Sequence, residues 1–179
     1  GAGDDLVGAG DDDDLVYGGI GADTLNGENG NDAVYGGDGD DWLTASAGND
    51  TLDGGAGNDS IYAGFGNDSV ILSDGADQLF GSTGIDTLDG SGGTAAETVV
   101  FTSATAGTVG AGTFQFFEAF TSDAGADSYD ANLATFNLTI STGADDDTVI
   151  GGSGNDTVYG GAGNDSLTGG AGNDTVFGD

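Results

Sequence analysis

A fixed nine-residue period runs through most of the chain. An aspartate recurs at every ninth position in two blocks, and a Val, Leu or Ile follows each of these aspartates by two residues. Gly stands two residues before the aspartate in twelve of the fourteen repeats. The aspartates are Asp5, Asp14, Asp23, Asp32, Asp41, Asp50, Asp59, Asp68, Asp77 and Asp86, then Asp147, Asp156, Asp165 and Asp174. A short fixed period is typical of a solenoid, so we predict stacked coils of backbone.

The charge of the chain determines what can hold such a solenoid together. The 179 residues include 32 Asp and Glu but no Lys, Arg, His, Cys or Met, and the formal net charge is −32. Self-repulsion should keep so acidic a chain unfolded. Because the period indicates a fold, a bound cation has to supply the missing charge. Calcium fits, since it takes about six to eight carboxylate and carbonyl oxygens. Zinc, copper and haem are disfavoured, because the chain has no imidazole, thiolate or thioether.

The same composition excludes several classes of function. Without Lys or Arg to neutralise phosphate, nucleic acid and anionic membrane surfaces are not expected as direct partners. No apolar run approaches membrane-spanning length, so direct membrane insertion is not expected. An enzyme is not expected either, because His, Cys and Lys are missing as bases or nucleophiles. The chain starts and stops inside a repeat without an initiator Met, which favours a fragment of a larger protein.

The repeats resemble the nonapeptide of the RTX (repeats-in-toxin) family. The best copies run Gly-Ala-Gly-Asn-Asp-Ser-Ile from Gly55, Gly-Ala-Gly-Asn-Asp-Ser-Leu from Gly161 and Gly-Ala-Gly-Asn-Asp-Thr-Val from Gly170. They are similar to G-G-x-G-x-D-x-U-x, in which U is aliphatic. The resemblance covers residues 1–90 and about 143–179. It implies an all-β, right-handed parallel β-roll in which Gly-rich turns alternate with short x-U-x strands, two repeats form one coil, and calcium lies between stacked turns.

The resemblance also implies the metal ligands. Aspartates one coil apart, such as Asp5 and Asp23, would share calcium along each edge, which gives about ten ions for the fourteen aspartates above. Backbone ligands are expected from the turn glycines, whose freedom at positive φ lets several carbonyls converge. These are Gly19, Gly21, Gly37, Gly39, Gly55, Gly57, Gly64, Gly66, Gly152, Gly154, Gly161, Gly163, Gly170 and Gly172. For any single repeat, an Asx-turn or a solvated charge is the alternative; the shared register favours metal.

Some repeats depart from the pattern. Asp12 and Asp145 replace the Gly two positions before the aspartate, and Glu28, Ser46, Ser73 and Ser82 replace the Gly four positions before it. Those turns are expected to bind weakly or to have an altered conformation. Asp77 and Asp86 have no aspartate partner one coil onward and are expected to form half-sites.

The period stops between the ten-repeat segment 1–90 and the four-repeat segment 143–179. Glu97 and Asp127 lie in degenerate repeats of this interruption, and strand-like runs cover 98–102, 113–120 and 135–142. We favour a continuation of the roll with longer, metal-free coils, in which Phe114, Phe116, Phe117 and Phe120 are mostly core or cap. The alternative is a lateral insertion that forms a binding surface.

Aromatic residues mark the outward strand positions. Tyr17 and Tyr35, Tyr62 and Phe80, and Tyr159 and Phe177 are each 18 residues apart, so each pair should stack on successive coils. Such columns either stabilise the sheet or form a contact face for another copy. We favour a calcium-dependent extracellular structural module of a surface layer, fibre or adhesin that assembles through its sheet faces or open ends. The alternative is a passive calcium-binding module of a secreted toxin, protease or lipase.

Overall fold

The computed structural model describes residues 1–92, 98–101, 103 and 105–178. These residues contain twenty β-strands and no helix. They form two compact units: residues 1–88 with 111–117, and residues 89–110 with 118–178 of the described chain. No helix in the described chain has the length and apolar character needed to cross a membrane.

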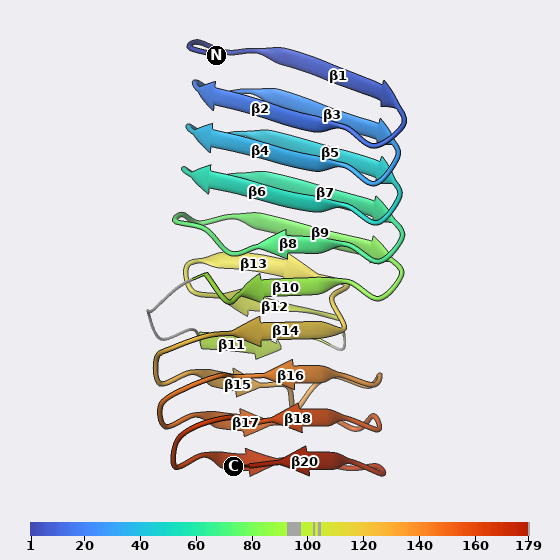
Figure 1. Cartoon of the computed structure of the whole chain (residues 1–179). Helices are drawn as coiled ribbons and strands as arrows, with labels where there is room; N and C mark the ends of the chain where they lie inside the picture. The colour runs from blue at the N-terminus through green and yellow to red at the C-terminus, as the bar shows by residue number, and fades with distance from the viewer. Residues whose placement is uncertain (93–97, 102, 104, 179) are drawn as a thin grey trace. The chain divides into compact units, whose positions relative to one another are not determined.

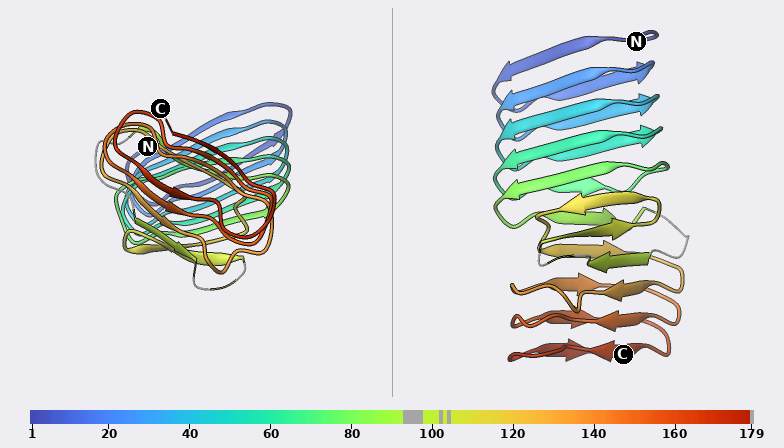
Figure 2. Two further views of the ribbon diagram at one scale, coloured as in Figure 1. Left: turned by 90° about the horizontal axis from the view of Figure 1, so that it is seen from below. Right: turned by 180° about the vertical axis from the view of Figure 1, so that it is seen from behind.

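The first unit is a parallel β-roll with two sheets. Consecutive strands alternate between the sheets, and each coil stacks on the one before in a right-handed sense (Figures 1 and 2). The first sheet has the order β1 (Leu6–Asp11), β3 (Thr24–Asn29), β5 (Trp42–Ala47), β7 (Ser60–Phe65), β9 (Gln78–Thr83) and β13 (Gly112–Gln115). The second has the order β2 (Leu15–Ile20), β4 (Ala33–Asp38), β6 (Thr51–Ala56), β8 (Ser69–Ile71) and β10 (Thr87–Gly90). The predicted all-β parallel solenoid is therefore confirmed.

Register in the first unit follows the nine-residue period. Val16 lies opposite Val34, and Leu52 lies opposite Val70, so each residue faces the one 18 positions onward. Most strands are six residues long, whereas the period predicted only x-U-x. The extra residues pair because turn amides also hydrogen-bond along the roll: Gly21 N–H donates to the carbonyl of Asp38 at 2.9 Å.

The second unit is also parallel over most of its length. One sheet has the order β12 (Ala106–Val109), β11 (Thr98–Phe101), β15 (Ser128–Asp130), β17 (Thr148–Ile150) and β19 (Ser166–Thr168). The other has the order β14 (Ala119–Ser122), β16 (Thr139–Ser141), β18 (Thr157–Tyr159) and β20 (Thr175–Phe177). Strands β11 and β12 are antiparallel, which the sequence did not predict.

Coil length changes inside the interruption. Phe120 lies opposite Ile140 and Tyr129 opposite Val149, which makes coils of 20 residues in place of 18. The run 113–120 is not one strand as predicted, because Phe116 takes a φ of 58° and separates β13 from β14. Of the four phenylalanines expected in the core, Phe116 is 42% exposed, and the other three are buried.

The aliphatic residue of each repeat forms a column inside each unit. In the first unit Leu25, Val34, Leu43, Leu52, Ile61 and Val70 have no exposed surface. Each such side chain contributes about 1.5–3 kcal/mol to folding when it leaves water. The second unit buries larger groups as well, with Phe120 and Tyr129 in edge-to-face contact at 6.1 Å. The core of the repeat segments therefore consists mainly of aliphatic side chains, whereas the core of the interruption also contains aromatic ones.

The predicted aromatic columns lie on the outer faces of the sheets. Centroid separations are 5.0 Å for Tyr17 and Tyr35, 4.5 Å for Tyr62 and Phe80, and 4.9 Å for Tyr159 and Phe177, all stacked. Trp42 adds a third ring to the second column, 4.9 Å from Tyr62. These rings extend cross-strand pairing along the roll axis.

Candidate metal centre

The repeat aspartates form a ladder along each edge of the first unit. In every step the backbone N–H of one aspartate donates to Oδ1 of the aspartate one coil onward. One edge runs from Asp5 through Asp23, Asp41 and Asp59 to Asp77, with distances of 2.7–2.9 Å. The other edge runs from Asp14 through Asp32, Asp50 and Asp68 to Asp86, with distances of 2.8–3.0 Å. The carboxylates are thus held between stacked turns, as the period predicts.

The second unit continues both kinds of ladder over a shorter length. Asp147 N–H donates to Asp165 Oδ1 at 3.1 Å, and Asp156 N–H donates to Asp174 Oδ1 at 3.0 Å. All four carboxylates come from the second repeat block. Asp165 and Asp174 are only half-buried, whereas Asp147 and Asp156 are each 1% exposed.

The second oxygen of most ladder carboxylates is buried and lacks a partner within the described residues. This holds for Oδ2 of Asp14, Asp23, Asp32, Asp41, Asp50, Asp59, Asp68 and Asp147. A buried charged oxygen without a hydrogen bond or ion pair destabilises the folded state by about several kcal/mol, so such atoms are rare in native proteins. The repetition of the same orphan atom at the same place in successive turns indicates a ligand that the chain itself does not supply.

Burial makes these carboxylates hard to ionise without a counter-charge. The pKa of Asp50, Asp59 and Asp68 is raised to about 6. Loss of water is the main cause, a backbone hydrogen bond from the preceding coil partly opposes it, and the charges of neighbouring carboxylates add to the rise. Desolvation also raises the pKa of Asp41, Asp77, Asp147 and Asp156. A divalent cation beside the ladder would instead lower the pKa of these carboxylates, because it favours their ionised form.

The turn glycines bring backbone carbonyls between the coils. Gly37 has a φ of 117°, and a Cβ at this position would overlap the carbonyl oxygen of Gly19 one coil earlier. Each of the fourteen glycines predicted as ligands has the same relation to the residue 18 positions before it. Eleven of them have positive φ; Gly152, Gly154 and Gly163 do not. Successive coils therefore approach so closely at these turns that a side chain would not fit between them.

Five of the imperfect turns keep the glycine conformation without glycine. Asp12, Glu28, Ser46, Ser82 and Asp145 have φ between 77° and 91°. Ser73 is not among the residues with positive φ, so this turn alone of the six takes another conformation. A residue other than glycine lowers the stability of the folded state by about 1–2 kcal/mol when its φ is positive. The roll therefore imposes its turn on residues that disfavour it. An altered conformation, one of the two outcomes expected of these turns, is seen only at Ser73, and weak calcium binding stays a prediction.

The donor set fits a hard cation with oxygen ligands. In the described part of the chain no three carboxylates converge on one point. A site built here would take one or two carboxylates from the ladder and complete its shell with backbone carbonyls. Calcium accepts this mixture, because it tolerates irregular geometry and neutral carbonyl ligands. Zinc and copper prefer nitrogen or sulfur donors, and the chain has no His, Cys or Met.

The structure adds one aspartate to the ladder. Asp127 N–H donates to Asp147 Oδ1 at 2.8 Å, and Asp127 is 2% exposed. Its separation from Asp147 is 20 residues, so it falls outside the nine-residue count, although Gly125 stands two residues before it. That local Gly-x-Asp signal was visible in the sequence. Glu97, the other acidic residue of a degenerate repeat, lies outside the described residues.

Leu138 takes an aspartate position on the other edge of the second unit. Its N–H donates to Asp156 Oδ1 at 2.8 Å, as an aspartate would, and its side chain is 2% exposed. Asp156 Oδ2 accepts the N–H of Gly152 at 3.1 Å, so this carboxylate is satisfied by the chain. At this position of the ladder a buried leucine replaces the carboxylate. In the first unit the Asp77 step ends in a similar way, because Gly112 packs against the Asp77 backbone in place of another aspartate.

A second ladder lies on the exposed side of the turns, at the residue before each aspartate. Asn58 N–H donates to Asp40 Oδ1 and Asn67 N–H donates to Asn49 Oδ1, both at 2.8 Å. Asn155 and Asn173 repeat this in the second unit at 2.8 Å. Asn and Asp serve equally as acceptors here, so this ladder needs no charge. Sequence reasoning did not identify it, although Asn recurs before the aspartate in many repeats.

Comparison with known proteins agrees with this geometry. The family model described as the RTX calcium-binding nonapeptide repeat matches four times, over residues 1–34, 35–70, 72–94 and 141–176. The matches cover well over half of the chain and leave out most of the interruption. No curated protein matches the sequence.

Proposed function

The chain belongs to the family of RTX calcium-binding nonapeptide repeat proteins, and from that premise we propose that it is an extracellular structural module that folds when calcium binds. The observation that carries this proposal is the row of buried carboxylate oxygens without partners along the ladder. Calcium supplies the positive charge that the sequence lacks.

Each ion is proposed to lie between turns stacked on the same edge. Asp41 and Asp59 with the carbonyls of Gly37 and Gly39 form a representative set of ligands. The remaining sites use the equivalent residues of the other repeats, including Asp5, Asp14, Asp77 and Asp86 at the ends of the first ladders. The two blocks together hold about ten ions. Asp127 and Asp147 are a candidate for one more.

Calcium binding is proposed to drive folding. Ordering nine residues costs roughly 9–18 kcal/mol of backbone entropy, and a single buried aliphatic side chain per repeat offsets little of it. A ligand that binds only the folded state stabilises that state in proportion to its own binding free energy. Since extracellular calcium modules bind in about the 10⁻⁴–10⁻³ M range, the chain stays unfolded at low calcium and folds after export.

Assembly with other copies is proposed on the outer faces of the sheets. Leu15 and Tyr17 lie on the outer face of β2 and are 62% and 64% exposed, and Ile20 at the end of the strand is 61% exposed. Apolar groups gathered on a strand surface favour contact with another protein surface. No catalytic role is proposed, since the carboxylates serve as metal ligands. The alternative is a passive folding module of a secreted protein, whose roll needs no partner copy.

Light scattering during a calcium titration tests the proposal. The chain is titrated from chelator to about 10 mM calcium, and circular dichroism is recorded in parallel. Folding accompanied by growth to large particles supports the structural module. Folding to a stable monomer supports the passive module. A β-sheet spectrum that persists in excess chelator contradicts calcium-driven folding itself.

A further inference from the structure

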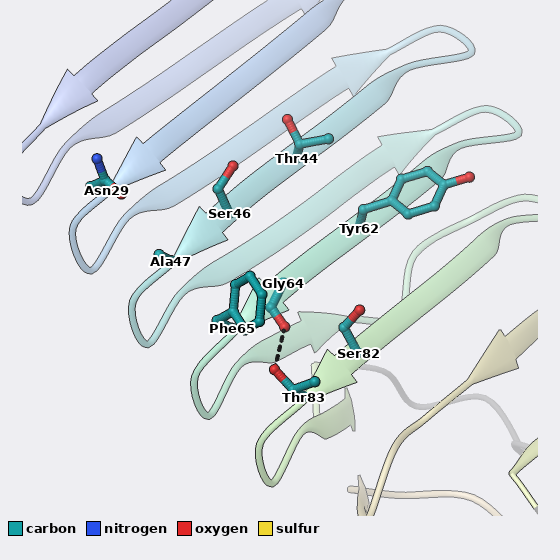
Figure 3. A pocket seen from close by; sticks show the side chains of 9 residues that line it. All are labelled: Asn29, Thr44, Ser46, Ala47, Tyr62, Gly64, Phe65, Ser82 and Thr83. Atoms are coloured by element: carbon teal, nitrogen blue, oxygen red, sulfur yellow. Dashed lines mark hydrogen bonds between the residues drawn. The ribbon is translucent and has the colours of Figure 1, made fainter.

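A groove crosses the outer face of one sheet in the first unit. It has a volume of about 470 Å³ and lies over the second halves of β3, β5, β7 and β9 (Figure 3). Gly64 of β7 is in register with Ser46 on one side and Ser82 on the other. Because Gly64 has no side chain, the column of outward side chains is interrupted there. This gap forms the floor of the groove.

The groove is uncharged, although the chain carries a net charge of −32. Hydroxyl groups come from Thr44, Ser46, Ser82 and Thr83, and an amide comes from Asn29. No Asp or Glu is among the nine lining residues. This lining offers hydrogen bonds but no counter-charge for a cation, and the acidic surroundings repel anions. The ligand that suits it is polar and neutral.

Aromatic side chains border the hydroxyl groups. The Phe65 side chain is 69% exposed and lies beside Gly64 in the groove (Figure 3). The residues in register with Phe65 are Ala47 and Thr83, so the fold does not require an aromatic ring at this position. Tyr62 is stacked between Trp42 and Phe80 and presents its edge. An exposed ring face next to hydroxyl and amide groups matches a sugar ring, which carries C–H groups on its faces and hydroxyls around its rim.

We propose that this groove binds a neutral oligosaccharide. The Phe65 ring packs against the C–H face of one sugar unit. Ser46 Oγ donates to Asn26 Oδ1 at 3.3 Å and Asn29 Nδ2 donates to Asp11 Oδ1 at 2.9 Å, so Ser46 Oγ and Asn29 Oδ1 act as acceptors for the sugar hydroxyls. The Ser82 hydroxyl also hydrogen-bonds to the sugar. The volume lies in the range of small-ligand pockets, about 300–1,000 Å³, and suits a segment of about two sugar units. Glycans that carry carboxylate or sulfate groups are rejected by the charge of the surrounding turns.

Trp42 provides a direct probe of occupancy. It is the only tryptophan in the chain, and its ring stacks at 4.9 Å on Tyr62, which lines the groove. The calcium-loaded chain is titrated with neutral trisaccharides of glucose, galactose, mannose and N-acetylglucosamine, and tryptophan fluorescence is followed. A saturable change with a Kd of about 0.1–10 mM is expected for at least one sugar. The absence of a saturable change with all four overturns the proposal.

Three variants locate the binding. Phe65→Ala is expected to weaken binding by at least about tenfold, because it removes the packing surface. Ser82→Gly keeps a residue that accepts positive φ and removes one hydroxyl, and a weakening of about threefold is expected. Phe177→Ala removes an exposed ring from the second unit and should leave the Kd unchanged. Unaltered binding by Phe65→Ala, or an equal loss in Phe177→Ala, overturns the assignment. Circular dichroism in calcium verifies the fold of each variant.

Discussion

The backbone N–H of Asp41 donates to Oδ1 of Asp59 at 2.8 Å, one coil further along the chain. The other oxygen of the Asp59 carboxylate is buried and has no hydrogen-bond partner within the described residues. One oxygen therefore connects two coils, and the other is available to an ion. Asparagine separates these roles, since it keeps the Oδ1 acceptor but loses the charge.

Asp59→Asn is expected to remove calcium from the turns that contain this residue and to raise the calcium concentration at which the chain folds. Isothermal titration calorimetry should count about two fewer ions, one on each side of Asp59 in the ladder. Asp40→Asn is the matched control. Asp40 is exposed and accepts the Asn58 N–H, a role that Asn49 fills in another repeat. Equal effects from both substitutions would show that net charge alone matters.

The dependence of folding on pH should change sign with calcium. In calcium-free buffer the folded-state pKa of Asp50, Asp59 and Asp68 is about 6, above the ordinary value of 3.8. The folded state then binds more protons than the unfolded state between these values, so stability is gained as pH falls from about 7 to 4 and is lost as pH rises through 6. Circular dichroism should show β-structure appearing on acidification.

With calcium present, the opposite direction is expected. Protons then compete with the ion for the same carboxylates. Because the calcium-free chain is unfolded and its carboxylates have the ordinary pKa of 3.8, the calcium concentration needed for folding rises as pH falls toward about 4. The comparison uses parallel titrations at about pH 7.5 and about pH 4. The same pH trend with and without calcium would be incompatible with carboxylate ligands.

Gly37→Ala should be much more damaging than Gly10→Ala. The two glycines occupy the same place in the repeat and have φ of 117° and 116°. A Cβ at Gly37 overlaps the Gly19 carbonyl oxygen, whereas a Cβ at Gly10 meets open space. The positive φ is expected to lower the free energy of unfolding of both variants by about 1–2 kcal/mol. The overlap should lower that of Gly37→Ala by about 1–3 kcal/mol more. Urea unfolding in saturating calcium measures the difference, and equal losses would show that the close approach of the coils is unimportant.

The interruption should keep more structure than the repeats when calcium is removed. Phe120, Tyr129, Leu138 and Ile140 of the second unit are each at most 2% exposed, and Leu138 stands where a repeat would place an aspartate. Hydrogen exchange in chelator is therefore expected to be slower in residues 118–142 than in residues 1–88.

Leu138→Ala tests the origin of this protection. The loss of a buried leucine costs about 2–5 kcal/mol, so the slow exchange should disappear in chelator. Leu133→Ala, at a position that is 52% exposed in the same segment, should leave it intact. Uniform fast exchange of the unaltered chain in chelator would contradict a metal-independent core.

Much of the fold could be predicted from the spacing of residues alone. The aliphatic column, the pairing of aspartates 18 residues apart and the stacked pairs such as Tyr62 and Phe80 all follow from a constant number of residues per coil. Register in a parallel roll is set by that number, so a periodic sequence determines which side chains meet.

The remainder depends on contacts that a period does not encode. Asp127 enters the ladder because the coil before Asp147 contains 20 residues, and Phe116 divides a strand-like run through its positive φ. The groove beside Gly64 arises from side chains three strands apart in space, and only the register reveals that Ser46 and Ser82 flank a glycine. The structure describes where the ladder aspartates lie. Which of their atoms bind the metal stays a prediction.

The shared carboxylates have a consequence for how the roll responds to its environment. Each ladder aspartate is hydrogen-bonded to the coil before it through its carboxylate and to the coil after it through its backbone N–H. Asp59, for example, accepts from the N–H of Asp41 and donates its own N–H to Oδ1 of Asp77. Ligand binding at one turn thus prepares the adjacent turns on the same edge, which is nearest-neighbour cooperativity in one dimension. With calcium as that ligand, such cooperativity would make folding a steep function of the calcium concentration.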